Sequence, residues 1–457
     1  MTNSQKNAAK PLKYILFLEV SHMITAKIVK EKFQSIIRHR ADNPSSFARH
    51  PEKDFTRNRT LTFEKTLSCV VSMDAGSIHR ELLRFFKFSS QTPSASALIQ
   101  QRKKLKINAF ENLFHEFNAA FPTKTYKGFH LLACDGSTIS VPLEQKKENE
   151  EYAYFKNKYW KRESYQLQLN AIYDLLGNRY VDLYMEPRHG HDERKALSSL
   201  IERNHLPENS ILIADRGYEG FALIAQIEQS NRYYLIRAKD NTQGGIIHGY
   251  PLPKEGTYDK TLTYTYTYRQ AKEFKMRPDV YKRVHYTPNK YFLNQDRPFY
   301  EMTIRFLRIM LPNGTYECLI TNLPENKFSA EEIKELYNMR WGIETSFRTL
   351  KYTVGLLYFH SKKVELIEQE IWSKLIMYNF FATITFNLPP KKFNGKYTYQ
   401  PNLTDALHIC RNFLRNNEAP PDIETLILLA LLPVRPGRKA PRNIRTHESV
   451  GLYYRVV

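Results

Sequence analysis

Apolar residues recur at helical spacing through most of the first quarter of the chain. The three-to-four-residue period is clear at residues 26–39, 77–88 and 94–121, and a polar loop at residues 40–59 separates the first segment from the other two. Such a period places the apolar side chains on one face of a helix. The N-terminal part of the chain is therefore predicted to be helical.

The pattern changes after residue 128. Short apolar runs predict five strands, at residues 129–134, 165–175, 179–186, 210–214 and 232–237. Two amphipathic segments predict helices, at residues 192–204 and 218–229. Three strands, a helix, a strand, a helix and a strand is an order typical of a mixed α/β sheet with helices packed against it.

A third pattern begins near residue 240. Residues 261–268 alternate threonine with leucine or tyrosine, which is the period of a strand, and Asn313-Gly314 between two apolar runs predicts a hairpin turn. The helical period returns over residues 328–388. The fold class predicted from these patterns is α/β, with a β-rich stretch between two parts of the core.

Charge adds a partner class to this picture. The chain of 457 residues carries 68 Lys and Arg against 47 Asp and Glu, a formal net charge of +21. Such an excess predicts a polyanionic partner, with nucleic acid as the first choice. The alternative is a cationic surface that only keeps the protein in solution.

Cysteine use and hydropathy exclude several classes of protein. The four cysteines stand far apart, at Cys69, Cys134, Cys318 and Cys410, so neither a zinc ribbon nor a disulfide framework is indicated. No apolar run approaches the ~20 residues that a membrane-spanning helix needs. We therefore expect a cytoplasmic protein without membrane contact.

A basic cluster follows a predicted helix start in the N-terminal region. Ser94 favours the start of a helix, and Arg102, Lys103 and Lys104 follow it. A small helical unit with glutamine and arginine on one face fits a DNA groove, so these three cations are predicted to bind DNA. The alternative is a solvated charged face on an ordinary helix.

Two aspartates stand at predicted strand ends. Asp135 follows the run that ends at Cys134, and Asp215 follows the run that ends at Ala214. Ligand sites in open α/β sheets gather beyond the carboxyl ends of strands, so both aspartates are candidates for a site there. Alternatively, each aspartate only shapes a turn, because a glycine follows it within two residues.

A third carboxylate lies on a helix with unusual spacing. Four polar residues occur at i, i+3, i+7 and i+14, namely Tyr337, Arg340, Glu344 and Lys351. At ~100° per residue they fall within ~60° of one another on the helix wheel. Arg340 and Glu344 alone would form an ordinary i, i+4 ion pair. That pair leaves the tyrosine and the distal lysine unexplained.

These residues have complementary chemistry. Two Mg²⁺ ions held by Asp135, Asp215 and Glu344 would activate a nucleophile and stabilise the leaving oxygen of a phosphodiester. Cations near this acidic group would hold the DNA phosphates, which the carboxylates otherwise repel. Arg340 and Lys351 are predicted to do so, and Tyr337 to donate a hydrogen bond to a phosphate oxygen.

At these residues the chain resembles a known family. The run Tyr337–Lys351 is similar to the Y-x2-R-x3-E-x6-K signature of bacterial DDE transposases of the insertion sequence four type. The stretches that begin at Asp135 and Asp215 resemble the first and second aspartate motifs of that family. The resemblance extends over roughly residues 50–385.

The resemblance implies both a fold and an activity. The fold is a ribonuclease-H-like mixed sheet core with a β-rich insertion and a helical N-terminal region. The activity is Mg²⁺-dependent cleavage of transposon ends, with Mn²⁺ as a plausible substitute, followed by joining of their 3′-hydroxyls to double-stranded target DNA. A homodimer in the synaptic complex and a bacterial, nucleoid-associated location are also implied.

The resemblance and the patterns together divide the chain into five regions. These are a helical DNA-binding region at 1–125, a first part of the catalytic core at 126–239, a β-rich insertion at 240–327, the glutamate helix and the following helix at 328–390, and a helical region with a basic tail at 391–457.

Other interpretations remain open at this point. His191, Arg194 and Tyr218 match the residue types of a tyrosine recombinase, although so short a match is expected by chance. A transposase-derived DNA-binding protein without activity, or a metal-dependent nuclease without strand transfer, would carry the same fold. Trp341 and Phe347 are expected to pack in the core rather than to stack on DNA bases.

Overall fold

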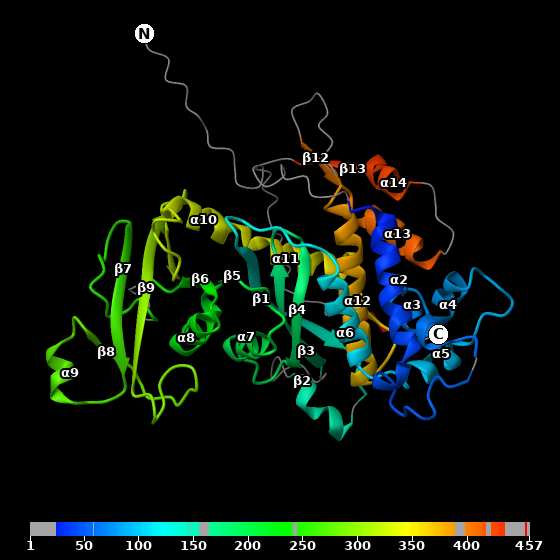
Figure 1. Ribbon diagram of the computed structural model, residues 1–457, viewed down its shortest axis with the longest axis horizontal. Helices are drawn as coiled ribbons and strands as arrows, with labels where there is room; N and C mark the ends of the chain where they lie inside the picture. The colour runs from blue at the N-terminus through cyan, green and yellow to red at the C-terminus, as the bar shows by residue number, and fades with distance from the viewer. Residues whose placement is uncertain are drawn as a thin grey trace, which may run out of the picture.

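The computed structural model describes most of the chain. The described residues are 24–57, 59–144, 146–154, 164–240, 245–388, 398–416, 422–434 and 453–454. Figure 1 shows an elongated molecule in which one long sheet reaches from one end to the middle, and a group of helices fills the other end. The predicted α/β class is confirmed at this level, because a large mixed sheet carries helices on both faces.

Ten strands of the described chain form this sheet. They are β1 His130–Val141, β2 Ala153–Tyr154, β3 Ser164–Asp174, β4 Arg179–Pro187, β5 Ser210–Ala214, β6 Tyr233–Ala238, β7 Tyr258–Thr267, β8 Tyr281–Arg283, β9 Phe299–Met310 and β10 Tyr316–Thr321. Their order is β2-β3-β1-β5-β6-β10-β9-β7-β8, with β4 paired to β3. β1 is parallel to β5 and antiparallel to β3, and β5 is parallel to β6.

Helices surround the sheet. Those before it are α2 Ala26–Asp42, α3 Phe63–Ser72, α4 Ile78–Phe85, α5 Ala95–Arg102 and α6 Asn108–Ala119. Those between strands are α7 Glu193–Glu202, α8 Phe221–Gln229 and α9 Lys272–Met276. Those after it are α10 Ala330–Met339, α11 Trp341–Arg348, α12 Val364–Thr385, α13 Leu403–Arg415 and α14 Ile423–Leu429.

Shorter elements connect these helices and strands. They are the 3₁₀ helices Pro44–Ser46, Lys147–Tyr152 and Arg216–Tyr218, the π-helical turn Thr349–Thr353, and the strands β11 Tyr358–Phe359, β12 Thr398–Pro401, β13 Leu431–Val434 and β14 Tyr453–Tyr454. β11 pairs with β14, and β12 pairs with β13.

The side chains of β1 enter two separate cores. Leu131 and Ala133 belong to the cluster that packs on the N-terminal helices and α12, whereas Leu132 and Cys134 belong to the cluster on α7 and α8. Successive residues of a strand point to opposite faces, so a fully apolar run is what a strand covered on both faces requires. This explains why residues 129–134 show no polar alternation.

α12 is the central helix of the molecule. It is buried along almost its whole length and packs against α2, α3, α6, α13 and β4. Apolar residues lie on every side of α12, so burial on every side stabilises it, and its buried polar residues bond inside the protein, as Glu370 does with Arg102. α12 therefore joins the N-terminal helices to the sheet (Figure 1).

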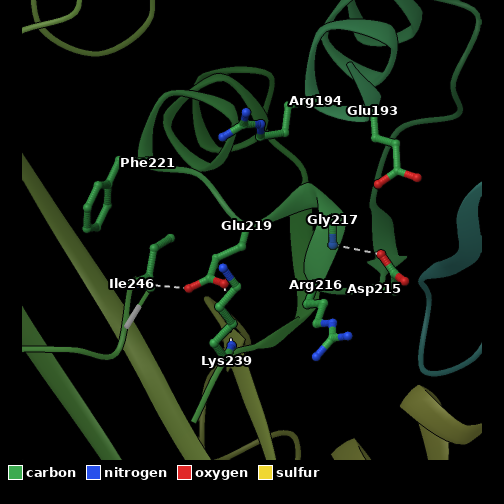
Figure 2. Close-up of a pocket in the computed structure, with 10 residues that line it drawn as sticks. Glu193, Arg194, Asp215, Arg216, Gly217, Glu219, Phe221, Lys239 and Ile246 are labelled. Atoms are coloured by element: carbon green, nitrogen blue, oxygen red, sulfur yellow. Dashed lines mark hydrogen bonds between the residues drawn. The ribbon is translucent and has the colours of Figure 1, made fainter. Parts of the chain in front are cut away.

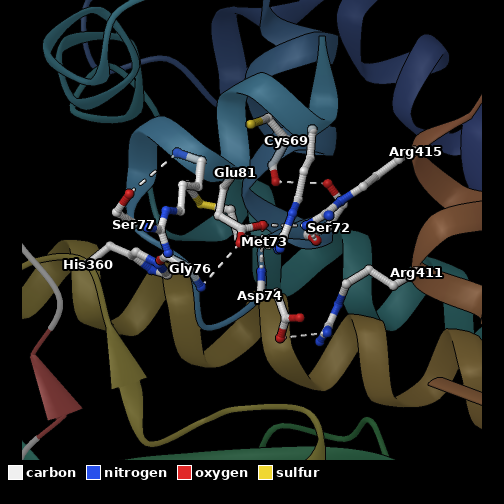
Figure 3. Close-up of polar contacts among 12 residues, drawn as sticks. Cys69, Ser72, Met73, Asp74, Gly76, Ser77, Glu81, His360, Arg411 and Arg415 are labelled. Carbon is white, nitrogen blue, oxygen red and sulfur yellow. Dashed lines mark hydrogen bonds and ion pairs between the residues drawn. The ribbon is translucent and has the colours of Figure 1, made fainter. Parts of the chain in front are cut away.

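Polar contacts also fasten α13 to the N-terminal helices (Figure 3). Glu81, which is buried, accepts the backbone N–H groups of Asp74 at 3.0 Å and Gly76 at 3.2 Å and pairs with Arg415. Arg411 pairs with Asp74 at 2.7 Å. Since buried carboxylates and guanidinium groups are stable only when paired, these contacts fix α13 in place.

The predicted hairpin is confirmed. β9 and β10 pair antiparallel around Asn313-Gly314, and Gly314 has a φ of +81°. Glycine adopts this left-handed conformation without the clash that a Cβ would cause. β10 then pairs with β6, so the strands of residues 258–321 extend the sheet that begins with β1.

Two element boundaries differ from the prediction. Residues 94–121 form two helices, α5 and α6, because the chain turns between them and Leu105 makes a bridge to Ala48. β1 continues through Asp135 to Val141, so Asp135 lies inside a strand rather than at its end. The apolar period alone does not reveal the turn between α5 and α6. It also ends before the second half of β1, because several residues there are partly exposed.

The helix around Glu344 is less regular than predicted. α10 ends at Met339, α11 begins at Trp341, and the last turn is π-helical over Thr349–Thr353. A constant 100° per residue therefore does not hold as far as Lys351.

Some predictions fall outside the described residues. The basic tail, apart from residues 431–434 and 453–454, is among them. In the part of the chain that is described, no helix has both the length and the apolar character needed to cross a bilayer.

Candidate active site

Two parallel strands bring Asp135 and Asp215 to the same region of the sheet. Cys134 of β1 pairs in register with Ala214 of β5, and each aspartate is the next residue. Asp135 Oδ1 accepts the N–H of Gly136 at 2.8 Å. Asp215 begins a 3₁₀ turn, and its Oδ1 accepts the N–H of Gly217 at 2.8 Å. Strand register therefore sets the relative position of the two carboxylates.

Arg340 connects this pair of strands to Glu344. α11 packs against β1. The Nη2 atom of Arg340 lies 2.9 Å from Glu344 Oε1, and its Nη1 atom lies 3.9 Å from Asp135 Oδ2. Arg340 is only 6% exposed, so this guanidinium spans the two carboxylates from a buried position, whereas the Glu344 side chain is 36% exposed. One buried cation therefore compensates two acidic groups that would otherwise repel each other.

The pKa of Asp135 reports the same convergence. Burial, the largest cause, and the negative charges of Asp215 and Glu344 together raise the pKa of this carboxyl to about 6, against the lowering effect of the Gly136 N–H and of Arg340. A carboxylate responds to others in this way only when they share a weakly screened region. The three acidic residues therefore act on one another electrostatically, although they are far apart in sequence.

Lys351 is partly buried and contacts the backbone of β1. Its Nζ donates to the carbonyl oxygen of Thr138 at 2.8 Å, and burial lowers its pKa. Thr138 is three residues beyond Asp135 on β1. Lys351 is therefore near the acidic group, but in this structure it is held by the backbone of β1.

Three aromatic residues of this helix pair differ in exposure. Tyr337 is 3% exposed, with the Arg340 guanidinium 5.8 Å from its ring centroid, so its side chain is buried in this structure. Phe347 is buried, as predicted. Trp341 is 52% exposed, so the prediction that it packs in the core is wrong. It begins α11 on the solvent side, and the helix buries Ile343 and Phe347 instead.

The N-terminal basic cluster separates into different environments. Arg102 is fully buried, where its Nη1 meets Glu370 Oε1 at 3.0 Å and its Nη2 donates to the Leu366 carbonyl at 2.9 Å. The prediction that Arg102 binds DNA is therefore wrong for this structure, because the side chain is buried and both of its terminal nitrogens bond inside the protein. Lys103 is exposed, and Lys104 is half-buried with its Nζ 5.8 Å from the Phe55 ring centroid.

The sequence interpretation missed a fourth carboxylate, Glu193. It lines a pocket of about 610 Å³ together with Asp215 and Gly217 (Figure 2). A Cβ on Gly217 would lie 1.8 Å from Glu193 Oε2, so only glycine leaves room for this approach. Burial raises the pKa of Glu193, and so does the charge of Asp215. The available signal is the acidic start of α7, where Asp192 and Glu193 stand side by side.

Cations are also part of this pocket. Arg194, Arg216 and Lys239 line it as well. Figure 2 shows Arg216 and Lys239 below the Asp215 turn and Arg194 above it. A phosphate group beside the acidic residues would need such cations to offset their repulsion.

The arrangement excludes a tyrosine nucleophile at Tyr218. This side chain is 2% exposed, and burial raises its pKa well above the usual value. A tyrosine that attacks DNA must be accessible and must lose its proton. The recombinase interpretation is therefore not supported.

Comparison with known proteins agrees with the motifs. Residues 126–380 match the family model described as Transposase DDE domain. Transposase InsG for insertion sequence element IS4 of Escherichia coli is 23% identical over 413 residues, which cover 85% of this chain and 86% of that protein. The transposase for IS231E of Bacillus thuringiensis subsp. finitimus is 22% identical over 307 residues, or 60% of this chain and 63% of that protein.

One solved structure is also similar. The piggyBac transposase synaptic complex with hairpin DNA aligns with 92% of this chain and 87% of its own, at a TM-score of 0.44 and 9% identity.

Proposed function

This chain belongs to the transposase DDE domain family and is a DNA transposase of the bacterial insertion sequence four type, and on that premise we propose that it cleaves transposon ends and joins their 3′-hydroxyls to target DNA. The proposed catalytic residues are Asp135, Asp215 and Glu344. The observation that carries the proposal is the Arg340 contact with both Asp135 and Glu344, next to the strand that precedes Asp215. The five regions predicted from the sequence are retained as part of this proposal.

The order of the central strands supports a ribonuclease-H-like core. β4, β3, β1, β5 and β6 are neighbours in that order, and the β3–β1 pair is antiparallel while the β1–β5 and β5–β6 pairs are parallel. Ligand sites of such sheets form beyond the carboxyl ends of parallel strands. Asp215 follows the end of β5, and Asp135 lies on β1 just beyond the last residue of β1 that pairs with β5.

The donor set fits divalent ions. Carboxylate oxygens are the ligands that Mg²⁺ and Mn²⁺ prefer, and Asp135, Asp215 and Glu344 supply them. A pair of bound ions would activate the attacking water or 3′-hydroxyl and stabilise the leaving oxygen. Arg340 would keep the carboxylates close together before the ions bind, and Glu193 would add negative charge beside Asp215.

We expect metal-dependent nicking to rise with pH through about 6. The pKa of Asp135 is raised to about 6, so below that pH a proton competes with the divalent ion for this carboxylate. Mg²⁺ titrations at several pH values would measure this, with the apparent affinity improving as the pH rises. Higher Mg²⁺ should move the midpoint to lower pH. An apparent affinity that does not change between about pH 5 and pH 8 would contradict the assignment of Asp135 as a ligand.

The DNA partner follows from the family and from the charge. Phosphate contacts are proposed for Arg340, Lys351, Lys103 and Lys104, and for Tyr337 if the helix moves on DNA binding. The helical region 1–125 and the strands of region 240–327 would recognise transposon ends. A homodimeric synaptic complex and a place at the bacterial nucleoid in the cytoplasm complete the proposal.

A strand-transfer assay tests the function directly. The full chain is mixed with Mg²⁺, paired transposon-end duplexes bearing free 3′-hydroxyls, and a supercoiled target plasmid. We expect covalent end–target products, because the same carboxylates serve cleavage and joining. Nicking without joined products would favour the nuclease alternative, and neither product would favour a DNA-binding protein without activity.

A further inference from the structure

A second group of potential metal ligands lies away from the carboxylates of the proposed active site. His115 of α6, Asp182 of β4 and His205, in the turn after α7, place their ligand atoms within 4.8 Å of one another. Among the residues that the structure describes, this is the one group of three or more such side chains that is so compact. It joins the N-terminal helices to the outer part of the catalytic sheet, since β4 pairs with β3 rather than with β1.

The separations within this group suit a tetrahedral ion. His115 Nε2 lies 3.5 Å from Asp182 Oδ1, and His205 Nδ1 lies 3.3 Å from Asp182 Oδ2. Zinc binds nitrogen and oxygen ligands at about 2.0–2.2 Å, so two ligands of a tetrahedral site stand about 3.4 Å apart. Small side-chain shifts would therefore place an ion between these three groups.

The hydrogen bonds around these three side chains leave ligand atoms that could bind an ion. Asp182 is fully buried, and its Oδ1 accepts the N–H of Leu183 at 2.7 Å, which orients the carboxylate and leaves Oδ2 toward His205. The Nε2 atom of His115 is buried and has no hydrogen-bond partner. A buried polar atom without a partner costs free energy, and a metal ion would remove that cost.

The surroundings resemble those of a site with fixed ligands. Trp372 of α12 stands 6.0 Å from the His115 ring, and the two imidazole rings are 3.9 Å apart between centroids. Arg203 approaches Asp182 Oδ1 at 3.6 Å, but it also donates to the Leu183 carbonyl at 3.1 Å and pairs with Glu111 at 3.3 Å. Its charge is thus shared with a second carboxylate, and Oδ2 stays available.

We propose that His115, Asp182 and His205 form a binding site for a zinc-like transition-metal ion, which fastens α6 to β4 and to the turn after α7. Two imidazoles and one carboxylate are a ligand set typical of zinc, whereas Mg²⁺ prefers oxygen ligands alone. His205 has 39% of its side chain exposed, so an ion and a fourth ligand from solvent have access. The role of this site is structural, and it is separate from the carboxylates that serve phosphoryl transfer.

Metal binding tests this site in a variant without the three carboxylates of the proposed active site. The background is full-length protein carrying Asp135→Asn, Asp215→Asn and Glu344→Gln, stripped with a chelator. Co²⁺ is the probe, because four-coordinate Co²⁺ absorbs visible light strongly. We expect one equivalent of Co²⁺ to give this spectrum, and one equivalent of Zn²⁺, but not excess Mg²⁺, to remove it.

Variants identify the ligands. In the parent, which is the variant without the three active-site carboxylates, Zn²⁺ is expected to raise the unfolding temperature. His115→Ala and His205→Ala, each added to this parent, are expected to abolish both that rise and the Co²⁺ spectrum. His39→Ala, an exposed histidine of α2, serves as the matched control and should retain both. If His115→Ala does not fold, His205→Ala decides, because that side chain lies on an exposed turn. No Co²⁺ spectrum in the parent, or an unchanged spectrum in His205→Ala, overturns the proposal.

Discussion

Glu344→Gln should reduce metal-dependent nicking of transposon-end DNA by two orders of magnitude or more while the protein stays folded. The substitution removes the negative charge that would bind a divalent ion but keeps the shape of the side chain. Losing several kcal/mol of transition-state stabilisation corresponds to about a thousandfold in rate, since each 1.36 kcal/mol is tenfold. The measurement is nicking of a labelled end duplex at saturating Mg²⁺.

The control is a carboxylate on the neighbouring helix. Glu335 is exposed on α10, so Glu335→Gln removes the same charge without touching the proposed site. Its nicking rate should stay within about twofold of the parent. Circular dichroism and the unfolding midpoint should match for all three proteins, because the Glu344 side chain is 36% exposed. Nicking by Glu344→Gln at the parent rate would defeat the assignment.

The second large effect concerns stability. Arg102→Ala is expected to destabilise the fold by about 3–5 kcal/mol, because it leaves the buried carboxylate of Glu370 without its charge partner. Burial alone would raise the pKa of Glu370, yet Arg102 and His360 hold it at about 2, so this carboxylate stays charged. Equilibrium denaturation in urea measures the loss as a lower midpoint.

The adjacent lysine gives the matched control. Lys103 is exposed at the end of α5, and Lys103→Ala should change the stability by no more than about 0.5 kcal/mol. The two variants also separate a structural from a DNA-binding role. Should Arg102→Ala keep the parental stability but lose DNA affinity, the groove interpretation of the basic cluster would be restored and the structural one abandoned.

Local sequence patterns are sufficient to predict elements whose ends are determined by residues close to them in the chain. β5 was predicted at residues 210–214, which are its observed bounds, because a short apolar run enclosed by polar residues leaves little choice. The hairpin at Gly314 depends on one backbone conformation that few residues tolerate. Both predictions needed only information within ten residues.

Predictions that depended on distant partners were less successful. Arg102 looked like a surface cation because its partner, Glu370, is 268 residues away. The closeness of Glu193 to Asp215 arises from the packing of α7 on the sheet and from the space at Gly217. The candidate carboxylates could be chosen from the ends of apolar runs and one helical spacing, although β1 continues beyond Asp135. The contact of Arg340 with Asp135 appears only in three dimensions.

The pairing of β6 with β10 has a mechanical consequence. An unbroken ladder of backbone hydrogen bonds runs from β5, which precedes Asp215, through β6 and β10 to β9 and β7. Tilting the far strands relative to Asp215 would strain or break bonds along this ladder. We therefore expect β7, β9 and β10 to move with β5 as one stiff unit, so that a force applied to these distal strands would reach the residues next to Asp215.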